Sequence, residues 1–134
     1  MKLISHSSRP LVWLLAFILL TCAIFIEALH APTINDQIIP HLDKIAHGAA
    51  FAVLAFLLFQ FVRSAGFTIR WTVPVAIVSM VTILGIIDEC MQAFVPGRTA
   101  SIGDGLSDIS GACIAVFLCF WQYHRGGLHE RHIA

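Results

Sequence analysis

Four long apolar stretches dominate this chain and constrain its fold more than any other feature. They lie at about residues 11–29, 43–62, 71–94 and 104–123. Each is close to the roughly 20 residues that an α-helix needs to cross a bilayer. The connections are short, so consecutive helices are expected to run antiparallel. The sequence therefore predicts an all-α integral membrane protein, an up-down bundle of four transmembrane helices. We expect a single domain over residues 1–134, with a flexible tail at 124–134.

The composition agrees with a membrane protein and excludes most soluble classes. Hydrophobic residues make up 58% of the chain and charged residues only 12%. That charged share is about half of what a soluble domain carries. It is too small to cover the surface of a soluble enzyme or a nucleic-acid-binding domain, and a disordered chain would be far less apolar. The four cysteines form no CxxC pair, so neither a disulfide framework nor a zinc site is expected.

The basic residues predict how the bundle is oriented. Most of them lie before the first stretch, between the second and the third, and after the fourth: Lys2, Arg9, Arg63, Arg70, Arg125 and Arg131. Cytoplasmic loops are rich in Lys and Arg. Both termini and the middle connection are therefore expected on the cytoplasmic side, which is an N-in/C-in topology.

Polar residues gather at the opposite, outer side of the predicted bundle. Pairs spaced by four residues occur at three helix ends: Asp43 and His47, Asp88 and Gln92, and Asp104 and Asp108. This spacing puts both members of a pair on one helix face. The same layer also contains Lys44, Glu89, Arg98 and Ser101, and Glu27 and Asp36 lie near it. Small residues follow the pairs and permit close helix approach: Gly48, Ala50, Gly111 and Ala115. We expect the polar residues to face one another across a shared vestibule.

Several members of this layer also have ordinary structural explanations. Asp43 is a reasonable N-cap for the second helix, and either Ser101 or Asp104 is one for the fourth. Lys44 is long enough to reach the lipid headgroups. His47 is explained equally well by a hydrogen bond within the bundle.

Caps explain neither Asp88 nor Asp108, because both lie inside the predicted helices, where an ionised group is costly. Each needs a partner, a proton or water. Arg98 is the best candidate partner, since its planar guanidinium can bind a carboxylate in bidentate fashion. One Arg and one Lys cannot neutralise all the outer acids. The surplus points to a bound cation, to protonated carboxyls or to a cationic ligand.

The polar residues form a recognisable pattern. It reads Asp43-Lys44-x-x-His47, Asp88-Glu89-x-x-Gln92, Pro96-Gly97-Arg98-x-x-Ser101-x-x-Asp104 and then Gly111. Over about residues 42–117 this pattern resembles the VanZ-like family of small bacterial membrane proteins. The resemblance implies a multi-pass protein of the bacterial cytoplasmic (inner) membrane. The family is named for a member that confers low-level resistance to the glycopeptide teicoplanin, and the resemblance implies no established reaction.

Two positions depart from the family pattern. Asp108 stands where the family usually has Asn, and Ala115 stands where a second glycine usually follows Gly111. The first departure adds a negative charge or a titratable proton, and the second slightly widens one helix contact. For this reason the resistance activity is not transferred directly to this chain.

Three kinds of function fit these residues. The first is a non-enzymatic cell-envelope protein whose outer cluster binds a lipid headgroup, a cell-wall precursor or a glycopeptide, with a link to antibiotic resistance. The predicted ligand-binding residues are Asp43, Lys44, His47, Asp88, Glu89, Gln92, Arg98, Ser101, Asp104 and Asp108. Membrane lipids are expected partners, and nucleic acid is not. A homo-oligomer is also compatible with this function. This function needs no cofactor.

The second function is a metal-assisted membrane enzyme acting on a lipid-linked substrate. His47 and the acids would hold a hard divalent cation such as Mg²⁺, and one acid would act as general base. Ser101 and Ser107 are candidate nucleophiles, although nothing in the sequence activates them. The third function is a structural or assembly subunit, in which the polar cluster only locks the helices together. A transporter is disfavoured, because no inverted repeat is visible and the polar groups lie near one surface.

Overall fold

The protein folds as a bundle of four helices. The computed structural model describes residues 9–30, 42–98 and 100–131. The helices are α1 (Arg9–Ala28), α2 (Leu42–Ser64), α3 (Thr72–Gln92) and α4 (Ile102–Arg131). Each of the four is long and apolar enough to cross a membrane. The predicted all-α fold with four membrane-spanning helices is thus confirmed.

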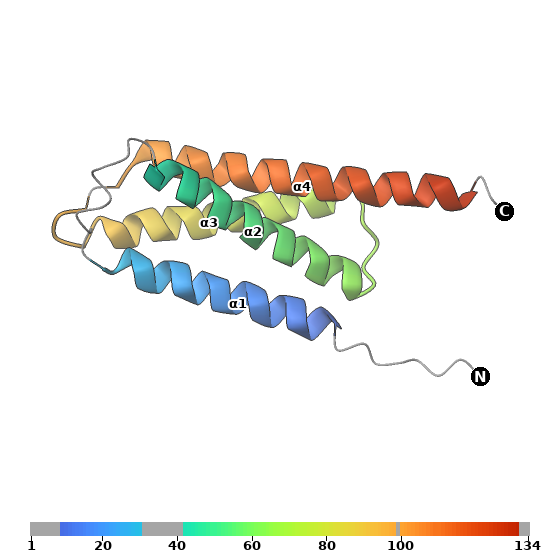
Figure 1. Ribbon diagram of the computed structural model, residues 1–134, viewed down its shortest axis with the longest axis horizontal. Coiled ribbons are helices and arrows are strands. Elements are labelled where there is room, and N and C mark those ends of the chain that lie inside the picture. Colours follow the sequence, from blue (N-terminus) through green and yellow to red (C-terminus); the bar gives the residue numbers. More distant parts are fainter. Residues whose placement is uncertain (1–8, 31–41, 99, 132–134) are drawn as a thin grey trace.

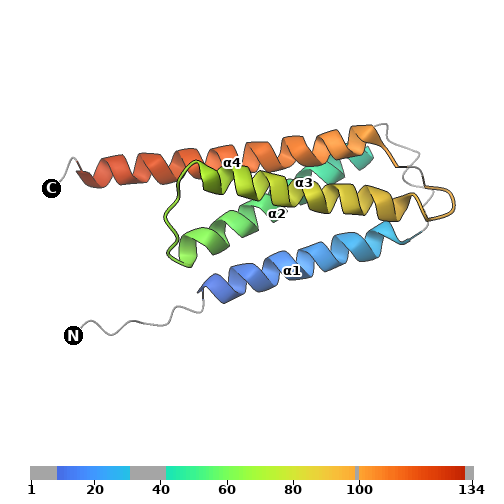
Figure 2. The ribbon, with the colours of Figure 1, turned by 180° about the vertical axis from the view of Figure 1, so that it is seen from behind.

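The helices run lengthwise and antiparallel in chain order (Figure 1). Figure 2 shows from behind that the start of α1 and the end of α4 lie at the same end of the bundle. α2 makes its most extensive contact with α4, and α1 packs mainly against α2. The opposite end, where α1 and α3 finish and α2 and α4 begin, is called the polar end below. Which side of the membrane each end faces stays a prediction.

The interior is built mainly from one face of α2. Phe51, Leu54 and Phe59 are almost fully buried and pack with Val81 of α3 and Ala112 of α4. Large apolar side chains also cover the outside of the bundle: Leu15, Leu19, Ile83, Ile114 and Phe117 are all exposed. A helix that is apolar all round belongs in lipid. The exposed apolar belt therefore fits the membrane-spanning role of the four helices.

Two glycines bring α2 and α4 into backbone contact near the polar end. A Cβ atom added at Gly111 would overlap the carbonyl oxygen of Gly48 and would lie 2.8 Å from its carbonyl carbon. A Cβ atom at Gly48 would lie 3.3 Å from the carbonyl oxygen of Ser107. The predicted close approach of small residues is therefore confirmed at Gly48 and Gly111.

A tight turn sets the connection that follows α3. Gly97 has a φ of 88°, and the N–H of Arg98 donates to the carbonyl oxygen of Val95 at 3.1 Å. Proline at the second position and a glycine with positive φ at the third are typical of a type II turn. Pro96 and Gly97 therefore form such a turn, and it places Arg98 at the polar end.

The C-terminal part of the chain differs from the prediction. We expected the fourth helix to end near Tyr123 and a flexible tail to begin at His124, but α4 continues to Arg131. Contacts at a spacing of four support this continuation. His124 stacks edge-on against Phe120, and the Arg125 guanidinium lies 4.1 Å from the ring centre of Trp121. The glycines at 126 and 127 were taken as flexible, yet a helix tolerates them at a modest cost. Asp36 lies outside the described residues.

Candidate functional site

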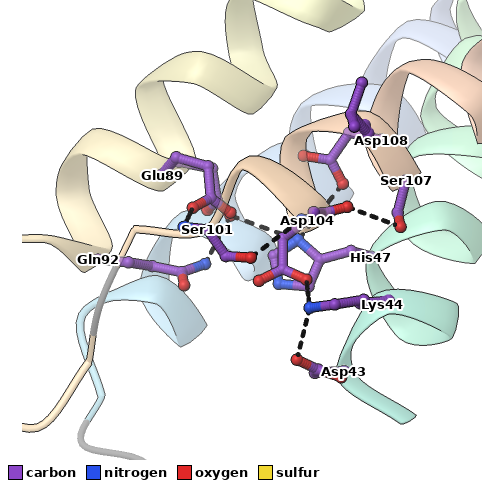
Figure 3. Close-up of polar contacts among 12 residues, drawn as sticks. Asp43, Lys44, His47, Glu89, Gln92, Ser101, Asp104, Ser107 and Asp108 are labelled. Atoms are coloured by element: carbon purple, nitrogen blue, oxygen red, sulfur yellow. Dashed lines mark hydrogen bonds and ion pairs between the residues drawn. The ribbon is translucent and has the colours of Figure 1, made fainter. Parts of the chain in front are cut away.

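The ten predicted ligand-binding residues all lie at the polar end, on α2, α3, α4 or the connection between α3 and α4. Figure 3 shows side chains of all three helices pointing toward one another there. Four of these residues are buried: Asp88, Gln92, Asp104 and Asp108. Asp88 and Asp108 are each only 1% exposed. Their burial is the central fact about this site, because acids are rarely buried unless they are paired.

His47 faces the buried acids from α2. Its Nδ1 atom lies 3.3 Å from Oδ1 of Asp108 and 4.0 Å from Oδ2 of Asp88. The first distance is short enough for a hydrogen bond, but the angles are not those of one, and Nδ1 has no hydrogen-bond partner. The close contact between Gly48 and Gly111 lies beside these residues. It thus sets the distance between His47 and Asp108.

The two acids of α3 are each held through one oxygen. The Nε2 group of Gln92 donates to Oδ2 of Asp88 at 2.9 Å, as the spacing of four between them suggests. The backbone N–H of Ser101 donates to Oε2 of Glu89 at 2.6 Å. The second oxygen of each acid is buried and has no hydrogen-bond partner in the part of the chain that the structure describes. Each carboxylate is therefore oriented by one protein group and leaves one oxygen free.

Ser101 is the N-cap of α4. Its Oγ atom accepts a hydrogen bond from the N–H of Asp104 at 3.3 Å, which is the contact expected of an N-cap serine. This decides between the two predicted caps in favour of Ser101. Because the backbone N–H of Ser101 also binds Glu89, the start of α4 is tied directly to the end of α3.

Lys44 binds two acids rather than reaching out to the lipid headgroups. Its Nζ atom lies 2.8 Å from Asp104 and 3.2 Å from Asp43. This pairing gives Asp104 a partner on a different helix. It also leaves Asp43 in the first turn of α2, where its carboxylate favours the helix N-terminus.

Arg98 has a different partner from the one we predicted. We expected it either to bind an anionic group or to hold Asp88 and Asp104, but its guanidinium binds Glu27, with the second contact at 3.4 Å. The pairing with Asp88 and Asp104 was wrong, because Lys44 binds Asp104 and Gln92 donates to Asp88. Sequence reasoning noted Glu27 only as one of the outer acids. Its position near the end of α1, level with the outer layer, was the available signal.

Glycine makes room for Asp108 in the interior. A Cβ atom at Gly85 would lie 2.9 Å from Oδ2 of Asp108 and 3.3 Å from the Phe51 ring. Gly85 thus admits the carboxyl group of a neighbouring helix. Among the described residues, neither oxygen of that carboxyl group has a hydrogen-bond partner.

Two cavities border this site, and Ser101 lines both. The first, called the vestibule, has a volume of about 440 Å³ and is lined mainly by polar groups, among them Lys44, His47, Arg98 and Ser101. The second, called the α3–α4 groove, has a volume of about 410 Å³ and a mainly apolar lining that includes Ile86, Leu106 and Ile109. Glu89 also lies in the groove.

Comparison with known families identifies the chain. The family model described as VanZ/LLP1 matches residues 4–123. The chain belongs to the VanZ/LLP1 family. Neither a comparison with curated proteins nor one with solved structures gave a match. For this VanZ/LLP1 protein, function must therefore be argued from its own site.

The site of this VanZ/LLP1 protein has the donor set of a small polar ligand site. His47, Asp88 and Glu89 each offer one ligand atom, and these atoms lie within 4.8 Å of one another. The serine hydroxyls that we considered as nucleophiles have other partners. Ser107 donates to the carbonyl oxygen of Gly103 at 3.0 Å, and Ser101 caps α4. Both hydroxyls are thus engaged with backbone groups.

Proposed function

We propose that this VanZ/LLP1 protein binds a membrane-resident amphiphile, with the polar headgroup in the vestibule and a hydrocarbon chain in the α3–α4 groove. The observation that carries the proposal is that Ser101 lines both cavities. One molecule can therefore occupy a polar space and an apolar space at once. Volumes of this size are within the range of small-molecule sites, about 300–1,000 Å³.

The charged groups of the vestibule suit a headgroup with an anionic part. Lys44 and Arg98 both line it. Arg98 is paired with Glu27, whose side chain is 63% exposed. Lys44 is paired with Asp43, whose side chain is 49% exposed, and with Asp104, whose side chain is 10% exposed. Exposed ion pairs contribute little to stability. An anionic headgroup can therefore replace Glu27 on Arg98 at small cost, and the guanidinium fork then binds phosphate in bidentate fashion.

This chemistry is shared by two sources in the envelope, a phospholipid and a lipid-linked cell-wall precursor. A glycopeptide is the ligand suggested by the family name, and the mass of a bound molecule would reveal one. We favour an amphiphile that enters from the bilayer, because the apolar groove lies between two membrane-spanning helices. A role in antibiotic resistance would follow only if that amphiphile is also the target of the drug.

Gly105 gives a way to block the groove without disturbing the fold. It lines the α3–α4 groove, and a Cβ atom added there meets no atom within 4 Å. Gly105→Leu therefore fills the groove and also favours the helix, because glycine is a poor helix former. Ser110→Leu is a matched control, since Ser110 lies on the same helix and lines a different cavity, between α2 and α4.

Native mass spectrometry of protein released from nanodiscs tests the proposal. The nanodiscs contain phosphatidylglycerol, and the protein is produced in bacteria so that envelope lipids are present. We expect the wild type and Ser110→Leu to retain a bound amphiphile and Gly105→Leu to lose it. The mass of the adduct distinguishes a phospholipid from a cell-wall precursor. The proposal fails if the folded wild type retains no amphiphile, or if Gly105→Leu retains it equally well.

A further inference from the structure

We propose that His47, Asp88 and Glu89 hold a divalent metal ion of the hard class, such as Mn²⁺ or Mg²⁺, at the inner wall of the site. The three residues come from two helices, α2 and α3. Their ligand atoms lie within 4.8 Å of one another, which is close to the roughly 4.4 Å that is the widest separation of two atoms sharing one ion at about 2.0–2.2 Å. Carboxylate oxygens with a single imidazole suit such cations.

The free atoms of the cluster support this assignment independently of the spacing. Among the described residues, Nδ1 of His47, Oδ1 of Asp88 and Oε1 of Glu89 are all buried without a hydrogen-bond partner. Asp88 is 1% exposed, so bulk solvent does not reach its free oxygen. An unsatisfied buried polar atom costs about 1–3 kcal/mol, and more when it is charged. A bound cation would satisfy all three residues at once.

The partnered atoms of the same carboxylates act as supports for metal ligands. Gln92 donates to the other oxygen of Asp88, and the N–H of Ser101 donates to the other oxygen of Glu89. A neutral donor thus fixes the orientation of each carboxylate, and on Asp88 the oxygen that Gln92 binds lies 4.0 Å from Nδ1 of His47. Metal-ligating carboxylates are usually held in this way.

The charge balance points in the same direction. Asp108 adds a third buried carboxyl beside His47, and both of its oxygens lack a hydrogen-bond partner. Within the described residues, Lys44 and Arg98 are the Lys and Arg side chains at the polar end, and both pair with other acids, Asp104 and Glu27. A protonated His47 would place one positive charge beside Asp88 and Asp108, which does not balance three carboxylates. A divalent ion would supply the missing positive charge.

The site can be tested with Mn²⁺ as the probe, because its electron paramagnetic resonance signal reports binding directly. Purified full-length protein is stripped with a chelator and titrated with Mn²⁺ in nanodiscs. Glu89→Gln and Asp88→Asn each remove one anionic ligand atom but keep an oxygen that can accept the hydrogen bond from Ser101 or Gln92. Asp43→Asn is the matched control, since Asp43 lies at the mouth of the vestibule and outside the cluster.

We expect one Mn²⁺ per chain for the wild type and for Asp43→Asn. We expect at least a tenfold weaker affinity for Glu89→Gln and Asp88→Asn, with Mg²⁺ competing for the same site. Circular dichroism of every sample shows that its helices are intact, and a thermal shift on addition of Mn²⁺ should appear only where Mn²⁺ binds. The assignment is overturned if the folded wild type binds no Mn²⁺, which would mean that shared protons neutralise the acids. It is also overturned if the two cluster variants bind as tightly as Asp43→Asn. Neither outcome depends on whether a lipid occupies the vestibule.

Discussion

The contact between Gly48 and Gly111 yields the sharpest test of the fold. In Gly111→Ala, the new methyl group would overlap the Gly48 carbonyl oxygen and lie 2.8 Å from its carbonyl carbon. Carbon atoms normally pack at about 3.5–4.0 Å, so α2 and α4 would have to move apart by roughly 1 Å. Overpacking of this kind costs about 1–3 kcal/mol. The loss falls on the most extensive helix contact in the bundle.

Gly105 supplies the control for this measurement. It lies on the same helix, and a Cβ atom there meets no atom within 4 Å. The higher helix propensity of alanine should therefore raise the free energy of unfolding of Gly105→Ala by up to about 1 kcal/mol. Thermal unfolding in detergent, followed by tryptophan fluorescence, should give Gly111→Ala a Tm several degrees below wild type. Gly105→Ala should be at or slightly above wild type. If Gly111→Ala is as stable as Gly105→Ala, the close approach of α2 and α4 is wrong.

Three further changes test single contacts of the site. Gln92→Leu removes the donor to the buried Asp88 carboxylate, so the free energy of unfolding should fall by about 1.5–3 kcal/mol. An unchanged Tm in thermal unfolding would contradict the hydrogen bond. Ser101→Ala removes the N-cap of α4 and should lower the free energy of unfolding by about 0.5–2 kcal/mol, whereas Ser101→Gly should lower it by only a few tenths of a kcal/mol. Equal losses in the two variants would argue against the cap. Arg98→Ala breaks an ion pair with the exposed Glu27, so the free energy of unfolding should change by less than about 1 kcal/mol. The retained amphiphile should nevertheless disappear from its native mass spectrum, and retention would show that Arg98 does not bind the headgroup.

Hydropathy was enough to predict the four helices, because a chain in lipid must satisfy its backbone within each span. The Pro96–Gly97 turn and the small residues at Gly48 and Gly111 could also be read from local sequence. These features depend on the chemistry of a few neighbouring residues. The end of α4 could not be read in this way. Beyond Tyr123 the polar composition resembles a loop, and only ring and cation contacts such as that between Arg125 and Trp121 favour a continued helix.

The membership of the polar layer was also predictable, but its pairing was not. Spacing of four correctly placed Asp88 and Gln92 on one face, where they bond. Whether Arg98 pairs with Asp104 or with Glu27 depends on where α1 packs and on the fact that Lys44 already binds Asp104. That is a competition among side chains on different helices. No periodicity within one helix encodes it.

The position of the buried acids near helix ends also bears on how the chain enters the membrane. Asp88 lies one turn before the end of α3, and Asp108 lies in the second turn of α4. An ionisable group is much cheaper near the interface than at the centre of a bilayer. Each helix can therefore be inserted during synthesis while its polar end stays hydrated in the headgroup layer. Because α2 pairs chiefly with α4, His47 and Asp108 meet only when the last helix arrives. The pocket is thus completed at the final step of assembly, and a chain truncated before α4 would present its acids to water instead of to one another.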